Sequence, residues 1–224
     1  AGTGDEFYLE IQPAYLGLQE GEYKIHTKAI DEADNTDNMS YNITIDNGAP
    51  EIASVNLDDY YVQPNTDVLV NASVSDPNLR WVKANNDRMS KNANGYWQTT
   101  LNLDGSSKNP IEVEARDEAN NVKTNDSQNY TIDDTAPTIS DIAIGASYNI
   151  TRSDEIVEFN VSSSDDHLRN VKINDTTLNE GEPWSVAVRP ELSFGCKVGV
   201  ENESCTLQAQ STDKADNTET ELFN

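Results

Sequence analysis

The sequence predicts an all-β fold of tandem β-sandwich domains, arranged as beads on a string. Three observations predict it: one pentapeptide recurs at domain-sized intervals, apolar and polar residues alternate with a period of two, and no stretch of ten residues has a helical period. Clusters of Asp, Asn, Gly and Ser interrupt the alternation, as the turns between short strands require. The chain has 224 residues, which is enough for two or three small domains.

The repeated pentapeptide sets the size of the unit. Its copies are DEADN at residues 31–35, DEANN at 117–121 and DKADN at 213–217, so they lie 86 and 96 residues apart. An Ala-Pro-x-Ile segment follows the first two copies, at residues 49–52 and 136–139. A unit of roughly 90 residues is too long for a solenoid repeat and suits a small β-sandwich.

Superposition of the copies predicts the domain boundaries. Complete domains are expected over residues 51–133 and 138–224, whereas residues 1–46 match only the second half of a domain. Half a sandwich cannot bury its apolar face alone. We therefore expect its missing first strands to belong to preceding chain or to be supplied by another subunit, and the sequence leaves both alternatives open.

Strands are expected wherever apolar residues occupy every second position, because one face of such a strand is buried. If Val82 and Ala84 point inward, Trp81 points outward beside Arg80 and is a candidate contact residue. The alternating positions are Val68, Val70, Ala72 and Val74; Trp97, Thr99, Leu101 and Leu103; Ile111, Val113 and Ala115; and Val157, Phe159 and Val161.

The charge of the chain excludes several classes of partner. It has 15 Lys and Arg against 40 Asp and Glu, which gives a formal net charge of -25. Such a field repels nucleic acid and anionic lipid, so neither is expected as a direct partner. No apolar run approaches the roughly 18 residues of a membrane-spanning helix, so no membrane insertion is expected in this segment. Residues 1–6 lack the features of a signal peptide, which would lie outside this chain.

Acidic residues recur where the linkers are expected to enter each sandwich. In a sandwich, the B–C and F–G loops return to the end at which the chain enters, so their side chains meet the linker. Carboxylates from separate loops suit Ca²⁺, which accepts 6–8 oxygen ligands and would lock adjacent domains into a rod. The alternative is a surface that is acidic by composition alone. The predicted ligands are Asp46, Asp76 and Asp117 for the middle domain, and Asp133, Asp134, Asp165 and Asp213 for the last.

Asn-x-Ser/Thr sequons are more frequent than the composition explains. Composition alone would give about four, and the chain contains nine. Two pairs, Asn42 with Asn129 and Asn71 with Asn160, fall at equivalent outward positions of two repeats, where a bulky glycan can be accommodated. The pattern predicts N-linked glycans on an extracellular protein, with an Asn-rich composition as the alternative. The sequons begin at Asn38, Asn42, Asn71, Asn125, Asn129, Asn149, Asn160, Asn174 and Asn202.

The remaining chemistry-bearing residues predict structure rather than catalysis. Cys196 and Cys205 are expected to close an inserted hairpin with a disulfide worth roughly 2–3 kcal/mol, and free thiols are the alternative. The two histidines, His26 and His167, have no conspicuous nucleophile beside them. Phosphate-binding, dinucleotide-binding and Cys/His metal motifs are also missing from the sequence. We expect no enzymatic activity and no catalytic residues.

The region around each pentapeptide resembles a known family. The segments AIDEADN at 29–35, ARDEANN at 115–121 and STDKADN at 211–217 are similar to the A-x-D-x-A-G-N turn of immunoglobulin-like repeats in bacterial and archaeal surface-layer glycoproteins and adhesins. The resemblance implies immunoglobulin-like sandwiches. Where the family often has Gly, this chain has Asp34, Asn120 and Asp216, the residue types that best tolerate the positive φ expected there.

The prediction for function follows from these features together. We expect a structural extracellular glycoprotein, a subunit or fragment of a surface layer or surface filament, whose repeats act as rigid spacers. Such a protein self-associates into a lattice or filament. The alternative is an adhesin or stalk module that binds a carbohydrate or protein ligand through exposed residues such as Trp81.

Overall fold

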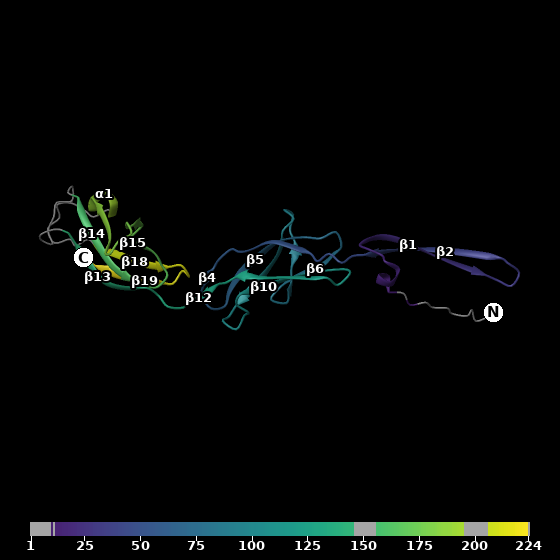
Figure 1. The fold of residues 1–224 in the computed structure, drawn as a ribbon. Helices are drawn as coiled ribbons and strands as arrows, with labels where there is room; N and C mark the ends of the chain where they lie inside the picture. Colours follow the sequence, from purple (N-terminus) through teal and green to yellow (C-terminus); the bar gives the residue numbers. More distant parts are fainter. Residues whose placement is uncertain (1–9, 11, 146–155, 195–205, 224) are drawn as a thin grey trace, which may run out of the picture. The chain divides into compact units, whose positions relative to one another are not determined.

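The structure is a computed structural model that describes residues 10, 12–145, 156–194 and 206–223 (Figure 1). It is built almost wholly of β-strands, as predicted, with one 3-10 turn, η1 (Pro13–Leu16), and one five-residue helix, α1 (Pro190–Phe194). No helix in the described part of the chain is long and apolar enough to cross a membrane. Cys196 and Cys205, with their predicted disulfide, lie outside the described residues.

The first two strands form an antiparallel hairpin, β1 (Gly21–Ile30) and β2 (Thr36–Ile45). Because side chains alternate, cross-strand pairs such as Ile25 with Tyr41 and Thr27 with Met39 share one face. Ile25 is 41% exposed, Tyr41 54% and Met39 59%. The described residues therefore leave the apolar face of this hairpin uncovered.

Two four-stranded sheets follow between residues 51 and 128. One has the order β3-β5-β9-β8 and the other β11-β10-β6-β7, while β4 and β12 form a short parallel pair. The bounds are β3 (Glu51–Leu57), β4 (Tyr61–Val62), β5 (Thr66–Ser75), β6 (Leu79–Ala84), β7 (Asp87–Arg88), β8 (Ser90–Lys91), β9 (Trp97–Leu103), β10 (Ile111–Asp117), β11 (Val122–Gln128) and β12 (Thr131–Ile132).

The alternation predicted for these strands is confirmed by their burial. The inward positions of β5 and β10 are buried throughout, and Leu101 and Leu103 of β9 are buried as well. Trp97 and Thr99, at the start of β9, are only half-buried. Val82 and Ala84 of β6 have no exposed surface, which places Trp81 on the outward face of its sheet as the sequence predicted.

The last part of the chain forms a β-sandwich around one apolar cluster. One sheet has the order β13-β14-β17 and the other β16-β15-β18-β19. Both contribute to the cluster, with Val157, Phe159 and Val161 from β14, and Val171 and Ile173 from β15. The bounds are β13 (Thr138–Ile144), β14 (Val157–Ser164), β15 (Leu168–Ile173), β16 (Thr176–Thr177), β17 (Trp184–Val188), β18 (Leu207–Asp213) and β19 (Thr218–Phe223).

Each pentapeptide forms the tight turn of an antiparallel hairpin. Its fourth residue has a positive φ in all three copies: 63° at Asp34, 70° at Asn120 and 65° at Asp216. This is the left-handed region, in which Asn and Asp are the most tolerated residues after Gly. The positive φ predicted at these three residues is therefore confirmed.

The chain divides into two compact units, residues 1–56, 71–99 and 112–126 and residues 57–70, 100–111 and 127–224. Paired strands in the described residues lie within 21–45, 51–132 or 138–223. The domain boundaries drawn from the sequence stay a prediction. Each of the two predicted groups of carboxylates lies within one compact unit.

Candidate metal site and linker contacts

The turn that each pentapeptide forms fixes an aspartate carboxylate by hydrogen bonds. In the second copy, Asp117 Oδ1 accepts from the backbone N–H of Asn121 at 2.8 Å, and Oδ2 accepts from Asn121 Nδ2 at 2.8 Å. In the third copy, Asp213 accepts the same two bonds from Asn217, at 2.9 Å and 2.8 Å. Asp117 and Asp213 are both completely buried. The last residue of the motif thus satisfies the buried carboxylate of its first residue.

The same Asn side chains also bind the preceding linker. Asn121 Nδ2 donates to the backbone carbonyl of Asp46 at 3.1 Å, and Asn217 Nδ2 donates to that of Asp133 at 2.9 Å. Each Asn therefore bridges a buried carboxylate and the chain that enters the sandwich. We call this arrangement the linker clamp; it consists of Asp117 and Asn121 on Asp46, and of Asp213 and Asn217 on Asp133.

In the first copy of the motif, Asn35 makes the same turn contacts but no linker contact among the described residues. Asp31 accepts from the Asn35 backbone at 2.8 Å and from Asn35 Nδ2 at 2.7 Å, but both residues are exposed. The Asn35 side-chain hydrogen bond lowers the pKa of Asp31 below its ordinary value of 3.8. The bond therefore stabilises this turn above pH 3.8, and the stabilisation is lost as the pH falls through the lowered pKa.

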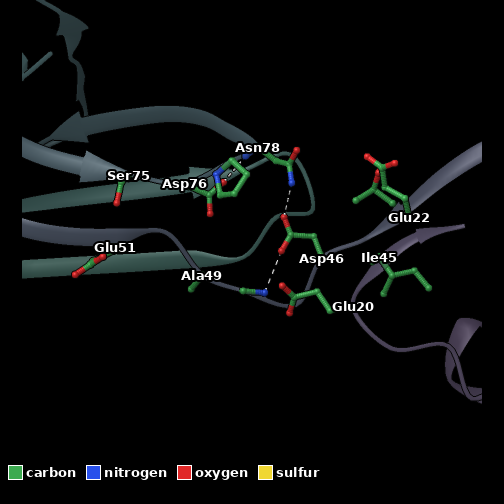
Figure 2. A pocket seen from close by; sticks show the side chains of 13 residues that line it. Glu20, Glu22, Ile45, Asp46, Ala49, Glu51, Ser75, Asp76 and Asn78 are labelled. Carbon is green, nitrogen blue, oxygen red and sulfur yellow. Dashed lines mark hydrogen bonds between the residues drawn. The ribbon is translucent and has the colours of Figure 1, made fainter.

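The first carboxylate cluster consists of Asp46, Asp76 and Asp117, the three residues predicted from the sequence. An oxygen from each carboxylate lies within 4.8 Å of the others. Asn78 holds two of them, because its Nδ2 donates to Asp46 Oδ2 at 2.9 Å and its backbone N–H donates to Asp76 Oδ1 at 2.7 Å. Figure 2 shows the Asn78 side chain directed at Asp46. The backbone N–H of Gly48 donates to Asp46 Oδ1 at 3.0 Å.

The donor set of this cluster fits Ca²⁺. None of its three carboxylates makes an ion pair with a Lys or Arg among the described residues. At such separations each pair of like charges costs on the order of 3 kcal/mol when the effective dielectric constant is about 20. A surface pocket of about 650 Å³ adjoins the cluster and adds the carboxylates of Glu20, Glu22 and Glu51 to its walls. Ca²⁺ offsets this repulsion and accepts oxygen ligands in flexible geometry.

The second cluster has a different donor set. Asp133 and Asp165 lie together as predicted, and the third member is His167. His167 Nδ1 is 2.9 Å from Asp133 Oδ2, its backbone N–H donates to Asp165 Oδ1 at 2.7 Å, and its ring centroid is 4.9 Å from that of Tyr61. Of the other predicted ligands, Asp134 is exposed, and Asp213 belongs to the clamp rather than to this group.

The sequence spacing could have placed His167 beside the linker, but its residue type differs from that of the equivalent Asn78. His167 follows Asp165 by two residues, as Asn78 follows Asp76. The backbone confirms the equivalence, because the carbonyl of Asn78 accepts from Glu118 N at 2.9 Å and that of His167 accepts from Lys214 N at 2.9 Å. The two residues occupy one structural position. The second linker is therefore contacted by an imidazole where the first is contacted by an amide.

The seven predicted glycosylation sites within the described residues all reach the surface. Asn71, Asn125 and Asn160 are half-buried. Asn149 and Asn202 lie outside the described residues. No described sequon is buried in a core, so each of these positions is sterically compatible with the prediction. The exposed sites are Asn38, Asn42, Asn129 and Asn174.

No protein-family model matches the sequence, and no curated protein matches it. The fold is similar to that of the fibronectin(III)-like modules of Clostridium thermocellum CbhA, with a TM-score of 0.43 and 11% identity over 75% of this chain and 91% of that one. It is also similar to Bacteroides ovatus SGBP-B in complex with a mixed-linkage heptasaccharide, with a TM-score of 0.25 and 9% identity over 90% of this chain and 49% of that one. The chain thus spans about half the length of SGBP-B.

Proposed function

We propose that the chain is part of a structural extracellular glycoprotein of a surface layer or surface filament, in which the repeats act as rigid spacers. The observation that carries the proposal is the linker clamp, which recurs with the same atoms at Asp46 and Asp133. A flexible tether between domains needs no buried contact with its linker. The same contacts hold both linkers. We infer that each repeat fixes the position at which the linker enters its sandwich.

Calcium binding at the first carboxylate cluster extends this proposal. The clamp fixes the backbone of Asp46, while the cluster leaves three like charges close together. Without a cation their repulsion favours opening of the linker from the sandwich. A bound Ca²⁺ removes the repulsion and adds ligand bonds from the linker and from two loops. Stiffness of the spacer would then depend on the calcium concentration outside the cell.

Chelation is expected to lower the melting temperature of the full chain by several degrees. A ligand present at 100 times its Kd adds about 2.7 kcal/mol to the free energy of unfolding. The measurement is a pair of thermal melts, in calcium and in EGTA. The variant with Asp46→Asn, Asp76→Asn and Asp117→Asn should show no difference between the two melts. Asp134→Asn, an exposed linker carboxylate, should leave the difference intact. Identical wild-type melts in calcium and EGTA would remove the cation from the proposal.

Glycosylation is expected to show in the intact mass of protein from the native source. Mass spectrometry should find an excess over the mass that the amino-acid sequence accounts for, in steps the size of a hexose. Peptide mapping should place glycans at exposed sequons such as Asn42 and Asn129. Unmodified protein from the native source would contradict the glycoprotein proposal and leave the Asn-rich composition as the explanation.

Electron microscopy of the native source tests the structural role directly. An ordered sheet or filament that an antibody against this chain labels along its length supports a spacer in a surface assembly. Labelling of free particles only would contradict it.

The second candidate function is a binding module of an adhesin or stalk. A specific observation favours it: Trp81 lies on the outward face of its sheet, where the equivalent residue of the last domain is Asn170, and several cations surround its ring. An aromatic ring that only one of the two domains places on this face is better explained by a ligand than by the fold.

A further inference from the structure

The outward face of the sheet β11-β10-β6-β7 carries a cluster of positive charges around one aromatic ring. Lys83 Nζ lies 4.5 Å from the centroid of the Trp81 ring, the Arg116 guanidinium 5.1 Å and the Arg88 guanidinium 5.9 Å. All are within the distance at which a cation is attracted to an aromatic face. We call these four residues the Trp81 patch. It holds three of the 15 basic residues of a chain whose net charge is -25.

One pair of these cations is unfavourable for the fold. Lys83 on β6 and Arg88 on β7 are directly opposite each other, and like charges in this position destabilise a sheet. Neither makes an ion pair with a carboxylate in the described part of the chain. With 40 acidic residues in the sequence, an Asp or Glu at either position would be an easy alternative. The attraction of both cations to the Trp81 ring offsets part of this repulsion and holds the two positive charges close together on the surface.

The last domain shows that the fold does not need this patch. At the equivalent register, Asn170 is opposite Thr212 and Lys172 is opposite Thr177, where the middle domain has Trp81 opposite Arg116 and Lys83 opposite Arg88. One cation remains and the aromatic ring is missing. Both domains nevertheless form the same sheet order around this position. The patch is therefore a feature of the middle domain and not of the repeat.

Arg116 adds a donor that the sheet leaves unused. Its Nη2 is 3.6 Å from Glu114 Oε1, whereas its Nε is buried and has no hydrogen-bond partner among the described residues. Glu114 forms an ion pair with Arg116 and lies opposite Lys83 on β6, so this carboxylate balances part of the positive charge of the three cations. The surplus of positive charge suits an anionic ligand with oxygen acceptors.

We propose that the Trp81 patch binds carboxylate or sulfate groups of an acidic carbohydrate. The proposal rests on the second candidate function, a binding module, and names its ligand class. The cations around the Trp81 ring favour a charged sugar over a neutral one, because a neutral sugar stacks on a free aromatic face. The positive charge of the patch is complementary to an anion although the whole chain is acidic, because salt screens the other carboxylates beyond roughly 8 Å.

A narrow ligand fits these charges better than a second copy of the chain does. A stable protein interface buries roughly 800 Å² on each partner, which would bring many carboxylates of both copies within the screening length. A carbohydrate chain that crosses β6 and β10 contacts the patch without that repulsion. We therefore propose a carbohydrate ligand, and association with a second copy of the chain would contradict that proposal.

The experiment is a titration of the full chain with polygalacturonate, with dextran as the neutral probe. Wild type should bind polygalacturonate and not dextran, and added salt should weaken the binding. The double variant Lys83→Gln, Arg88→Gln should bind at least about tenfold more weakly, because each charge-assisted contact is worth about 1.5–3 kcal/mol. Lys172→Gln, which removes the equivalent cation of the last domain, should bind like wild type. Melting of each variant checks that it is folded.

Each of four other results would contradict a different part of the proposal. Equal binding of polygalacturonate by wild type and the double variant would overturn the assignment to the patch. Binding of dextran that Trp81→Ala abolishes would overturn the anionic ligand and leave a binding module. No binding of either probe would overturn both the ligand class and the binding module, and leave the spacer function unaffected. Concentration-dependent association of the chain that the double variant abolishes would assign the patch to a second copy.

Discussion

Asn121→Ala is expected to lower the free energy of unfolding of the middle domain by about 2–3 kcal/mol, because it leaves a buried carboxylate without one of its two donors. Asp117 is completely buried, and Asn121 Nδ2 serves both its Oδ2 and the carbonyl of Asp46. A loss of this size corresponds to a fall of about 10 °C or more in the melting temperature of a small domain. Asn217→Ala should have the same effect on the last domain, where Asp213 is equally buried.

The first copy of the motif provides the matched control. Asn35 makes the same two bonds to Asp31, but the turn is exposed, so water replaces the lost donor. Asn35→Ala should therefore lower the melting temperature far less than Asn121→Ala does. Hydrogen exchange measured by mass spectrometry assigns each loss to residues 51–133 or 138–224. Equal and small effects in all three variants would show that burial of the carboxylate does not determine the strength of the clamp.

The clamp also explains how much of the site the sequence could predict. The repeat marked Asp117 and Asn121, the strand pattern placed the turn at one end of a sandwich, and the topology of a sandwich brings Asp46 and Asp76 to the same end. The structure brings these three carboxylates within 4.8 Å. Every step rests on residue type and sequence spacing, because the motif is local and its turn has few alternative conformations.

Features that depend on the register between distant strands could not be predicted in this way. The sequence indicates that Trp81 points outward, but not that Arg116 lies opposite it or that Arg88 lies opposite Lys83. His167 was missed for another reason: a His and an Asn satisfy the same position by donating from a side-chain nitrogen to a linker carboxylate. Because His and Asn are different residue types, the hydrogen bond that they share could not be recognised by comparing the repeats.

Ile111→Ala is expected to cost about 2–5 kcal/mol, because it leaves a cavity in a closed core. Ile111 has no exposed surface and lies six residues before Asp117 on β10. Ile25 lies six residues before Asp31 on β1 and occupies the same position of the repeat, but it is 41% exposed. Ile25→Ala should therefore change the free energy of unfolding by about 0.5 kcal/mol or less, as surface substitutions do.

The comparison between these two variants also tests whether other strands cover the apolar face of the β1–β2 hairpin in the native protein. Urea unfolding followed by circular dichroism gives the stability of each variant, and hydrogen exchange locates the loss. A small effect of Ile25→Ala in this chain, together with a large one in native protein from its source, shows that other strands cover the apolar face there. Those strands complete the half-sandwich whether they come from preceding chain or from another subunit. Equal and small effects in both materials would mean that the face stays open, and that the first copy of the repeat is a hairpin rather than part of a domain.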